Sequence, residues 1–587
     1  MDYKFLLVFC LYFIFFLSLL LYLVFMISKI LKNHYCLIYF IVILCFISLS
    51  YSHIITNKRY NAANRFFKDI NQHNLSFNEQ IDMSSFIEKE IQFYKSKLLL
   101  NESEICPYHP FPREINEPYP SILIDMFNAI ESILKNVTNH QKSPPPGLMC
   151  SIIYGNEIIH QFGQGSKNLS EPENPPDLNT VFGIGSITKL FPSIMTMQLE
   201  ESGIIRSLDD PLQSLAPDFE IRNPYSDTDK VTFRSVLSQL SGLPRQTPCE
   251  SCFDCDNVVN CNVTSEWIFN RSKYESLILP SYTRPSYSNF GFSLLGRIPE
   301  PIIEKSFEEY VEDNIILPLD MNRSGFYLTD DIKNNMAQGY SFDLSPVEFT
   351  SYGWENPSGG AFSSVNDLSK LIIQFIEAHN MKDSKILTAT SMKRMMQAAF
   401  LDYDGQTLIS YPWESFFIDS YFVRCKAGNT VGYSGVSCVI PEMSVGFVIL
   451  VNADVDTFSY AIPTMEIIIP TFYKILNEIT ITAPLPPNPN DYEGEFSPYP
   501  EGNGIIKISN DNNERMIMYL KELPIFNSTM VYLEENLFQI IAPNSSPSRF
   551  MGSCQNIELG AFQYESIYYS PDKQFIHFGN GGVYQRN

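Results

Sequence analysis

Positively charged residues are scarce in this chain. Its 587 residues include 41 lysines and arginines against 65 aspartates and glutamates, which gives a net charge of −24 at pH 7. Proteins that bind nucleic acid usually present a basic surface, so this balance argues against a nucleic-acid partner. Because 45% of the residues are hydrophobic, the composition also argues against a disordered chain.

The cysteines lack the two-and-two spacing of a zinc ribbon. Three of the twelve lie in the apolar N-terminal region: Cys10, Cys36 and Cys45. Four others crowd a polar insertion at residues 249–261: Cys249, Cys252, Cys255 and Cys261. We expect disulfides here rather than zinc, because the N-terminal region indicates export, and we expect no metal or other cofactor. The nine cysteines outside the leader are odd in number, so at least one is unpaired or intermolecular.

Residues 1–56 form an apolar leader. Residues 5–27 are long enough to span a bilayer, and a second apolar run at 35–49 follows Lys29 and Lys32. With a start at Met26, the second run is a signal peptide and the body is secreted. With a start at Met1, both runs can span the membrane and the body again lies outside the cytosol. We therefore expect a body in the secretory pathway, either secreted or membrane-anchored, and glycosylation sequons agree with this: Asn74, Asn101, Asn136, Asn168, Asn262, Asn270, Asn322, Asn527 and Asn544.

Composition and periodicity divide the rest of the chain into four parts. Residues 57–105 are polar and partly helical, as expected of a stalk or covering segment. Residues 106–483 begin with a helix pattern at 122–137 and a hairpin at 149–162, an order that indicates an α/β (α+β) domain. Residues 484–491 are a proline-rich linker, and 492–587 alternate short apolar strands with turns, which predicts a small antiparallel β domain or barrel.

A serine and a lysine stand together at a predicted helix start within 182–190. Ser186 and Lys189 are three residues apart, so on a helix they lie on the same face. The free N–H groups at a helix N-terminus favour negative charge there, so this serine could attack a carbonyl carbon. Amphipathic helix patterns follow at 232–244 and 307–319. A serine followed three residues later by lysine is common by chance, so this motif alone decides nothing.

Two companion motifs make the pattern specific. Tyr287-Ser288-Asn289 lies on a turn ahead of a helix, and Lys426-Ala427-Gly428 leads into a hairpin at 433–452. Ser-x-x-Lys, Tyr-Ser-Asn and Lys-Ala-Gly in this order resemble the penicillin-recognising serine hydrolases, within them the class C β-lactamase and D-alanyl-D-alanine carboxypeptidase branch. The resemblance covers residues 123–452 and implies a two-lobed domain, with an antiparallel sheet flanked by helices and the site between the lobes.

The resemblance also implies roles for the motif residues. Ser186 would be the acylated nucleophile, Lys189 the neighbouring amine, and Tyr287 the group that shuttles protons. The substrate-binding set would be Asn289, Lys426, Gly428 and Asn429. Asn289 would donate to a substrate amide, Lys426 would meet a substrate carboxylate or lower the pKa of Tyr287, and the N–H groups of Ser186 and Asn429 would form the oxyanion hole. The substrate would be a small molecule or a peptide.

Two residues depart from the family pattern, and two other functions stay open. Ala427 replaces the usual threonine or serine, which removes a hydroxyl that would bind a carboxylate, and Pro192 lies early in the nucleophile helix. Cys425, next to Lys426, could be a reactive thiol, but we favour a structural cysteine or a disulfide with Cys438 on the neighbouring strand. A catalytically idle scaffold or binding protein would keep the fold, and an esterase or transacylase would use the same residues.

Overall fold

The computed structural model describes residue 115 and residues 117–587, except 142–143, 249–260, 381, 404, 406, 420, 479–484, 503, 512–514, 522, 542–565 and 579–581. Three expectations therefore lie outside the described residues: the leader at 1–56, the stalk at 57–105 and most of the cysteine-rich insertion. None of the helices within the described ranges combines the length and the apolar composition that crossing a bilayer requires.

A helix and a hairpin open the described chain, as predicted. Helix α4 (Ser121–Asn139) buries the apolar residues that recur at helical spacing: Leu123, Met126, Phe127, Ile130, Ile133, Leu134 and Val137. Strand β1 (Gly147–Tyr154) then turns at Gly155 into strand β2 (Glu157–Gly165). Gly155 has a φ of +61°, which a glycine adopts without steric cost.

The central sheet has eight antiparallel strands in the order β2-β1-β12-β11-β10-β9-β8-β7. Its later strands are β7 (Phe400–Leu401), β8 (Thr407–Ile409), β9 (Glu414–Ile418), β10 (Tyr421–Thr430), β11 (Tyr433–Ile440) and β12 (Val445–Val451). Strand β1 pairs with β12 from Leu148↔Val451 to Tyr154↔Val445. The predicted 433–452 hairpin is therefore joined to the N-terminal hairpin in one sheet.

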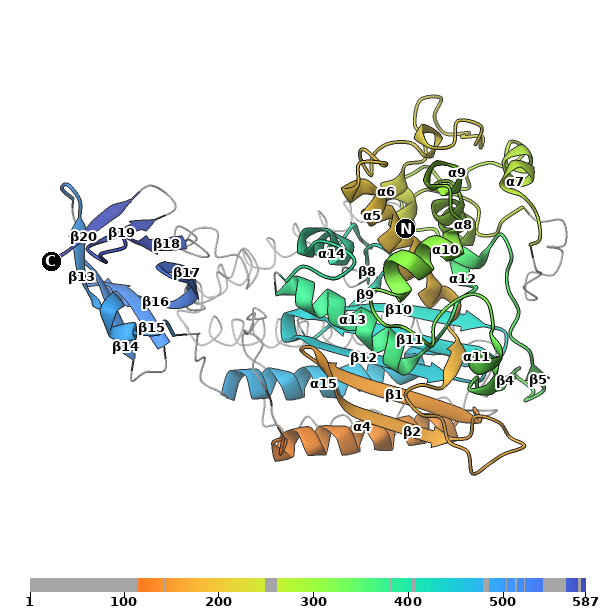
Figure 1. Ribbon diagram of the computed structural model, residues 1–587, viewed down its shortest axis with the longest axis horizontal. Coiled ribbons are helices and arrows are strands. Elements are labelled where there is room, and N and C mark those ends of the chain that lie inside the picture. The colour runs from red at the N-terminus through yellow and green to blue at the C-terminus, as the bar shows by residue number, and fades with distance from the viewer. Residues whose placement is uncertain are drawn as a thin grey trace, which may run out of the picture. The chain divides into compact units, whose positions relative to one another are not determined.

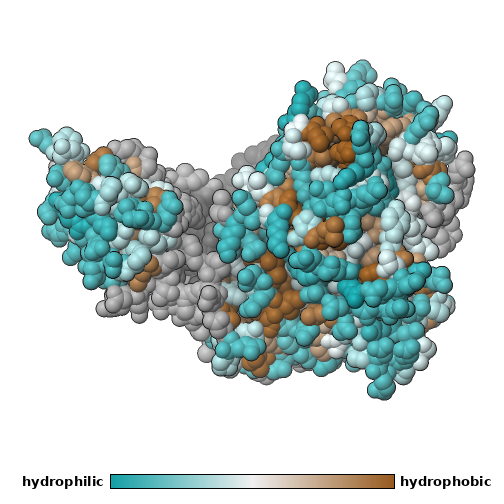
Figure 2. All heavy atoms as spheres, viewed as in Figure 1, coloured by the Kyte–Doolittle hydropathy of each residue, from teal (hydrophilic) through white to brown (hydrophobic). Residues whose placement is uncertain are grey.

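Helices cover both faces of this sheet (Figure 1). Helices α4 and α15 (Phe458–Glu478) share one apolar cluster with the sheet, and α13 (Val365–His379) shares another. Successive side chains of β1 point to opposite faces of the sheet, so Leu148 belongs to the cluster with α4 and α15 and Met149 to the cluster with α13. The molecular face in Figure 2 is largely hydrophilic, with hydrophobic residues in small separate patches.

The other lobe is mostly helical. A short strand, β3 (Val181–Gly183), pairs with β6 (Phe362–Ser364) and leads into the 3₁₀ turn η1 (Gly185–Lys189) and helix α5 (Leu190–Glu201). Around them pack α6 (Phe233–Leu237), α8 (Asn289–Arg297), α10 (Phe307–Val311) and α12 (Asn356–Gly359). Pro192 lies in the first turn of α5, where a missing N–H costs little.

Two helices predicted from amphipathic patterns are shorter than expected. The helix predicted at 232–244 is confined to α6, because Gln239 adopts a φ of +59° and turns the chain. The helix predicted at 307–319 changes from α10 to a π-helical turn at Glu312–Ile316, ahead of Pro318, which has no N–H to donate. The serine-bearing turn is also 3₁₀ rather than α-helical, although Ser186 and Lys189 still share a face.

The C-terminal residues form a separate closed barrel of eight antiparallel strands. These are β13 (Gly494–Pro498), β14 (Ile506–Asp511), β15 (Arg515–Leu520), β16 (Leu523–Glu534), β17 (Leu537–Ile541), β18 (Ser566–Tyr569), β19 (Phe575–Phe578) and β20 (Val583–Arg586). The aromatic rings of Tyr492, Phe538 and Tyr569 pack against one another in its core. The predicted small β domain is confirmed.

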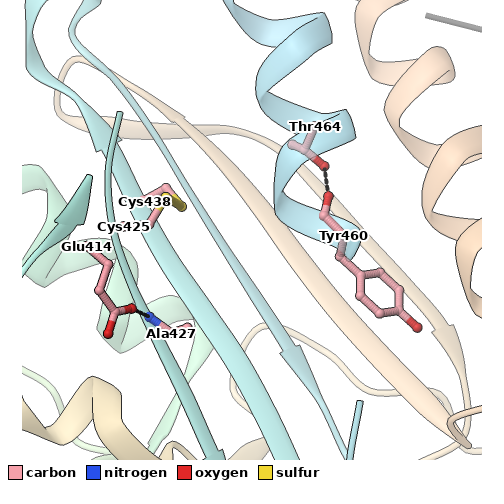
Figure 3. Close-up of a disulfide and its surroundings, with 6 residues drawn as sticks. All are labelled: Glu414, Cys425, Ala427, Cys438, Tyr460 and Thr464. Atoms are coloured by element: carbon pink, nitrogen blue, oxygen red, sulfur yellow. Dashed lines mark hydrogen bonds between the residues drawn. A yellow bond between two sulfur atoms is a disulfide. The ribbon is translucent and has the colours of Figure 1, made fainter. Parts of the chain in front are cut away.

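The described cysteines agree with the expected disulfides. Cys425 on β10 and Cys438 on β11 are bonded to each other (Figure 3), which confirms the predicted pair. Cys261 is also disulfide-bonded, whereas Cys150 is free and buried. Burial raises the pKa of the Cys150 thiol to about 12, so this cysteine stays protonated at neutral pH.

Replacing both Cys425 and Cys438 by alanine should lower the free energy of unfolding by about 2–4 kcal/mol, because the cross-link restricts the unfolded chain. Denaturant unfolding of the purified body measures this. Cys150→Ala is the matched control, since it removes a buried sulfur without a cross-link and should cost about 1 kcal/mol. A double variant as stable as the Cys150 control would contradict the prediction.

Candidate active site

Ser186 lies where the helical lobe meets strand β10. Its neighbour Gly185 has a φ of +47°, and a side chain there would come within 2.6 Å of the Asn429 carbonyl oxygen. Glycine is therefore required for the turn and for the close approach of the strand. Ser186 itself is only partly buried, whereas its neighbours from Val181 to Gly185 are buried.

Lys189 is fully buried beside Ser186. Its Nζ donates to Ser186 Oγ at 3.0 Å, to Asn289 Oδ1 at 2.8 Å and to the Ser358 carbonyl oxygen at 2.6 Å. Burial lowers the pKa of Lys189, the nearby charge of Lys426 lowers it further, and Tyr287 opposes this. A lysine with a lowered pKa can exchange protons with its neighbours closer to neutral pH.

Tyr287 lies between two lysines. The Nζ atoms of Lys189 and Lys426 are 4.8 Å and 5.3 Å from the centre of its ring. Burial by itself raises the pKa of Tyr287, but the positive charges of the two lysines outweigh burial and hold the pKa below its usual value. The phenolate of Tyr287 is therefore easier to form than that of an isolated tyrosine.

The edge of strand β10 lies along the turn that carries Ser186. The Ala427 N–H points to the outer edge of β10, where it donates to Glu414 Oε2 at 3.4 Å. Successive N–H groups of a strand alternate in direction, so the Asn429 N–H points to the same edge. A side chain at Gly428 would lie 2.0 Å from the Ile184 carbonyl oxygen and 2.8 Å from the Ser186 nitrogen, so this contact also requires glycine.

The side chains of the two asparagines are fixed in different ways. Asn289 begins α8, accepts from Lys189 and donates from Nδ2 to Gln246 Oε1 at 3.0 Å. The Asn429 Nδ2 donates to the Val455 carbonyl oxygen at 2.9 Å, so it is the Asn429 main chain that faces Ser186. No local pattern points to Gln246, because folding brings its loop next to α8.

Glu414 is the second residue that sequence reasoning missed. Its Oε1 accepts from Lys426 Nζ at 2.7 Å, and Lys426 also donates to the Ala427 carbonyl oxygen at 3.0 Å. The pKa of Lys426 is lowered by burial, but Glu414 and then Tyr287 outweigh this and raise it. Only the pairing of β9 with β10 brings Glu414 to Lys426, so no local motif announces it.

The family model described as Beta-lactamase matches residues 137–467, more than half of the chain. The chain belongs to the β-lactamase family. Its described elements form the β-lactamase/transpeptidase-like fold, with an antiparallel sheet between helices and a further C-terminal antiparallel β domain. All seven residues predicted for the site come from within the matched residues.

Several relatives are similar to this chain. Beta-lactamase-like protein 2 of Dictyostelium discoideum is 33% identical over 65% of this chain and 69% of its own. Protein flp of Staphylococcus aureus (strain MW2) is 25% identical over 42% of this chain and 48% of its own. Among solved structures, a class C β-lactamase is 19% identical, with a TM-score of 0.49 over 60% of this chain and 96% of its own.

Proposed function

We propose that the protein is a serine hydrolase that cleaves amide or ester bonds through an acyl-enzyme on Ser186. The observation that supports this is the meeting of three groups from two segments that are distant in the sequence. Ser186 Oγ lies 3.0 Å from Lys189 Nζ, which in turn lies 4.8 Å from the centre of the Tyr287 ring. A hydroxyl, an amine and a phenol in contact are the parts of an activated nucleophile.

In the proposed reaction, deprotonated Tyr287 takes the hydroxyl proton of Ser186 as Oγ bonds to the substrate carbonyl carbon. The carbonyl oxygen becomes an oxyanion that accepts hydrogen bonds from the N–H groups of Ser186 and Asn429. Tyr287 returns the proton to the leaving amine or alcohol as the C–N or C–O bond breaks. A water molecule then attacks the acyl carbon in the same way, and Ser186 Oγ leaves with the proton.

The neighbouring residues serve this proton transfer. Lys189 and Lys426 supply the positive charges that favour the phenolate of Tyr287. Asn289 holds the ammonium of Lys189 and is itself held by Gln246. We further propose that the body is exported, secreted or anchored by the apolar segments at 1–56, and that its substrate is a small molecule or a peptide.

Mass spectrometry after exposure to a fluorophosphonate and to a penicillin tests the function. We expect a fluorophosphonate adduct on Ser186 that is absent from the Ser186→Ala variant. A penicillin adduct as well would indicate a penicillin-recognising pocket, and its absence an esterase-like one. If the folded protein forms no adduct with either reagent, the site is idle and the scaffold alternative is correct.

Replacing Lys426 by methionine should move the acidic limb of the labelling rate to higher pH by about one unit or more. The reaction needs deprotonated Tyr287, and loss of a neighbouring positive charge raises the pKa of its phenol. The fluorophosphonate labelling rate as a function of pH measures this shift. Lys305→Met is the control, because Lys305 is an exposed partner of Asp313 and should leave the profile unchanged.

A further inference from the structure

Lys426, at the strand end of the site, is buried and paired with a carboxylate. It is 1% exposed and donates to Glu414 Oε1 at 2.7 Å and to the Ala427 carbonyl oxygen at 3.0 Å. Its Nζ also lies 5.3 Å from the centre of the Tyr287 ring. Glu414 therefore offsets the positive charge that would otherwise attract a substrate carboxylate.

The residues beside Lys426 also disfavour an anion. Glu414 brings a negative charge to the same place, with 26% of its side chain exposed. Figure 3 shows its carboxylate turned along the edge of β10 to the Ala427 N–H, so it takes a main-chain donor there too. Ala427 has no hydroxyl to offer, and its methyl group packs with the apolar cluster of α4 and α15. A second carboxylate here would meet the like charge of Glu414.

We propose that Glu414 is a specificity-determining residue that excludes substrates carrying a carboxylate next to the scissile group and leaves the site to neutral esters and amides. This inference rests on the proposed acylation of Ser186. Glu414 would have two effects. Its carboxylate cancels the charge of Lys426 toward the substrate, and it keeps Lys426 in place beside Tyr287.

Arg245 is a nearby cation that could attract a substrate carboxylate and so oppose its exclusion by Glu414. Its exposed guanidinium lies 5.1 Å from the centre of the Tyr287 ring. An exposed arginine in water contributes little to binding a single anion, because solvent screens its charge. We therefore expect Arg245 to change the rate of encounter with an anion and not the preference between neutral and charged substrates.

A matched pair of thioesters tests the proposal. One is the N-benzoylglycyl thioester of thioglycolic acid, which carries a carboxylate on the leaving group, and the other is the methyl ester of the same compound, which is neutral. A thiol reagent measures the thiol released from each. We expect the wild-type kcat/KM for the neutral compound to exceed that for the acid by about tenfold or more. In Glu414→Gln and Glu414→Ala, the activity on the acid should rise relative to the neutral compound and close most of that gap.

Glu442→Gln is the matched control. Glu442 pairs with Arg424 on the same strand as Lys426, at 2.6 Å, so this variant loses an equal charge nearby and should keep the wild-type preference. A wild-type enzyme that prefers the acid, or a preference that Glu414→Gln leaves intact, would overturn the proposal. The proposal would also be overturned if the wild type preferred the acid and Arg245→Ala removed that preference. Fluorophosphonate labelling of Ser186 is measured on each variant. If Ser186 of the wild type is labelled but the enzyme shows no preference between the two thioesters, this inference alone is contradicted. If the folded wild type is not labelled, the proposed function is contradicted.

Discussion

Replacing Lys189 by methionine is expected to slow acylation of Ser186 by about four orders of magnitude, because the residues of such a site act as a unit. Lys189 Nζ donates to Ser186 Oγ and to Asn289 Oδ1 and lies 4.8 Å from the centre of the Tyr287 ring. Without its charge, the pKa of Tyr287 rises, so Tyr287 stays protonated at neutral pH and no base remains beside the hydroxyl. Methionine has a similar length and fills the buried volume.

The second-order rate constant of fluorophosphonate labelling measures this loss, and thermal unfolding shows whether the fold is kept. Lys393→Met is the control, since Lys393 is a partly buried lysine on α14 (Ala389–Met396) and its replacement should leave labelling unchanged. A Lys189→Met protein that is folded and labels at the wild-type rate would remove Lys189 from the mechanism.

Replacing Gly428 by alanine is expected to lower the acylation rate by about a hundredfold to a thousandfold, the effect of losing one oxyanion-hole donor. A Cβ atom there would lie 2.0 Å from the Ile184 carbonyl oxygen and 2.7 Å from the Ile187 nitrogen, both main-chain atoms. Main-chain atoms cannot relieve the contact by a rotamer change, as a flexible side chain can. The strand must therefore move away from the turn, which separates the N–H groups of Ser186 and Asn429.

Gly435→Ala is the matched control for this variant. Gly435 is the residue paired with Gly428 on the neighbouring strand, and a Cβ there would meet first the Leu450 side chain, at 2.5 Å. Leu450 can change rotamer, so Gly435→Ala should cost some stability and little activity. Equal activity losses in the two variants would show that alanine disturbs the sheet generally and not the oxyanion hole.

Short-range patterns predicted much of this molecule. Strands β1 and β2 follow from the two runs on either side of the Gly155-Asn156 turn, and α4 follows from its apolar spacing. Both are local, because neighbouring residues decide them. The same patterns overestimated the length of the helix at 232–244, since the positive φ at Gln239 that ends it depends on how the chain packs there.

The amino-acid sequence alone predicted which four residues would come together, Ser186, Lys189, Tyr287 and Lys426, because their ordered motifs resemble those of the β-lactamase family. It also predicted the disulfide between Cys425 and Cys438, because the two cysteines fall on predicted neighbouring strands.

The surroundings of those residues depend on how the chain folds in three dimensions. Glu414 reaches Lys426 because β9 pairs with β10, and Gln246 reaches Asn289 because its loop packs against α8. The balance of burial and charge that lowers the pKa of Tyr287 likewise exists only where both lysines converge on it. Such contacts join residues that no local pattern links, since hydrogen bonds and electrostatic interactions depend on distance in space and not along the chain.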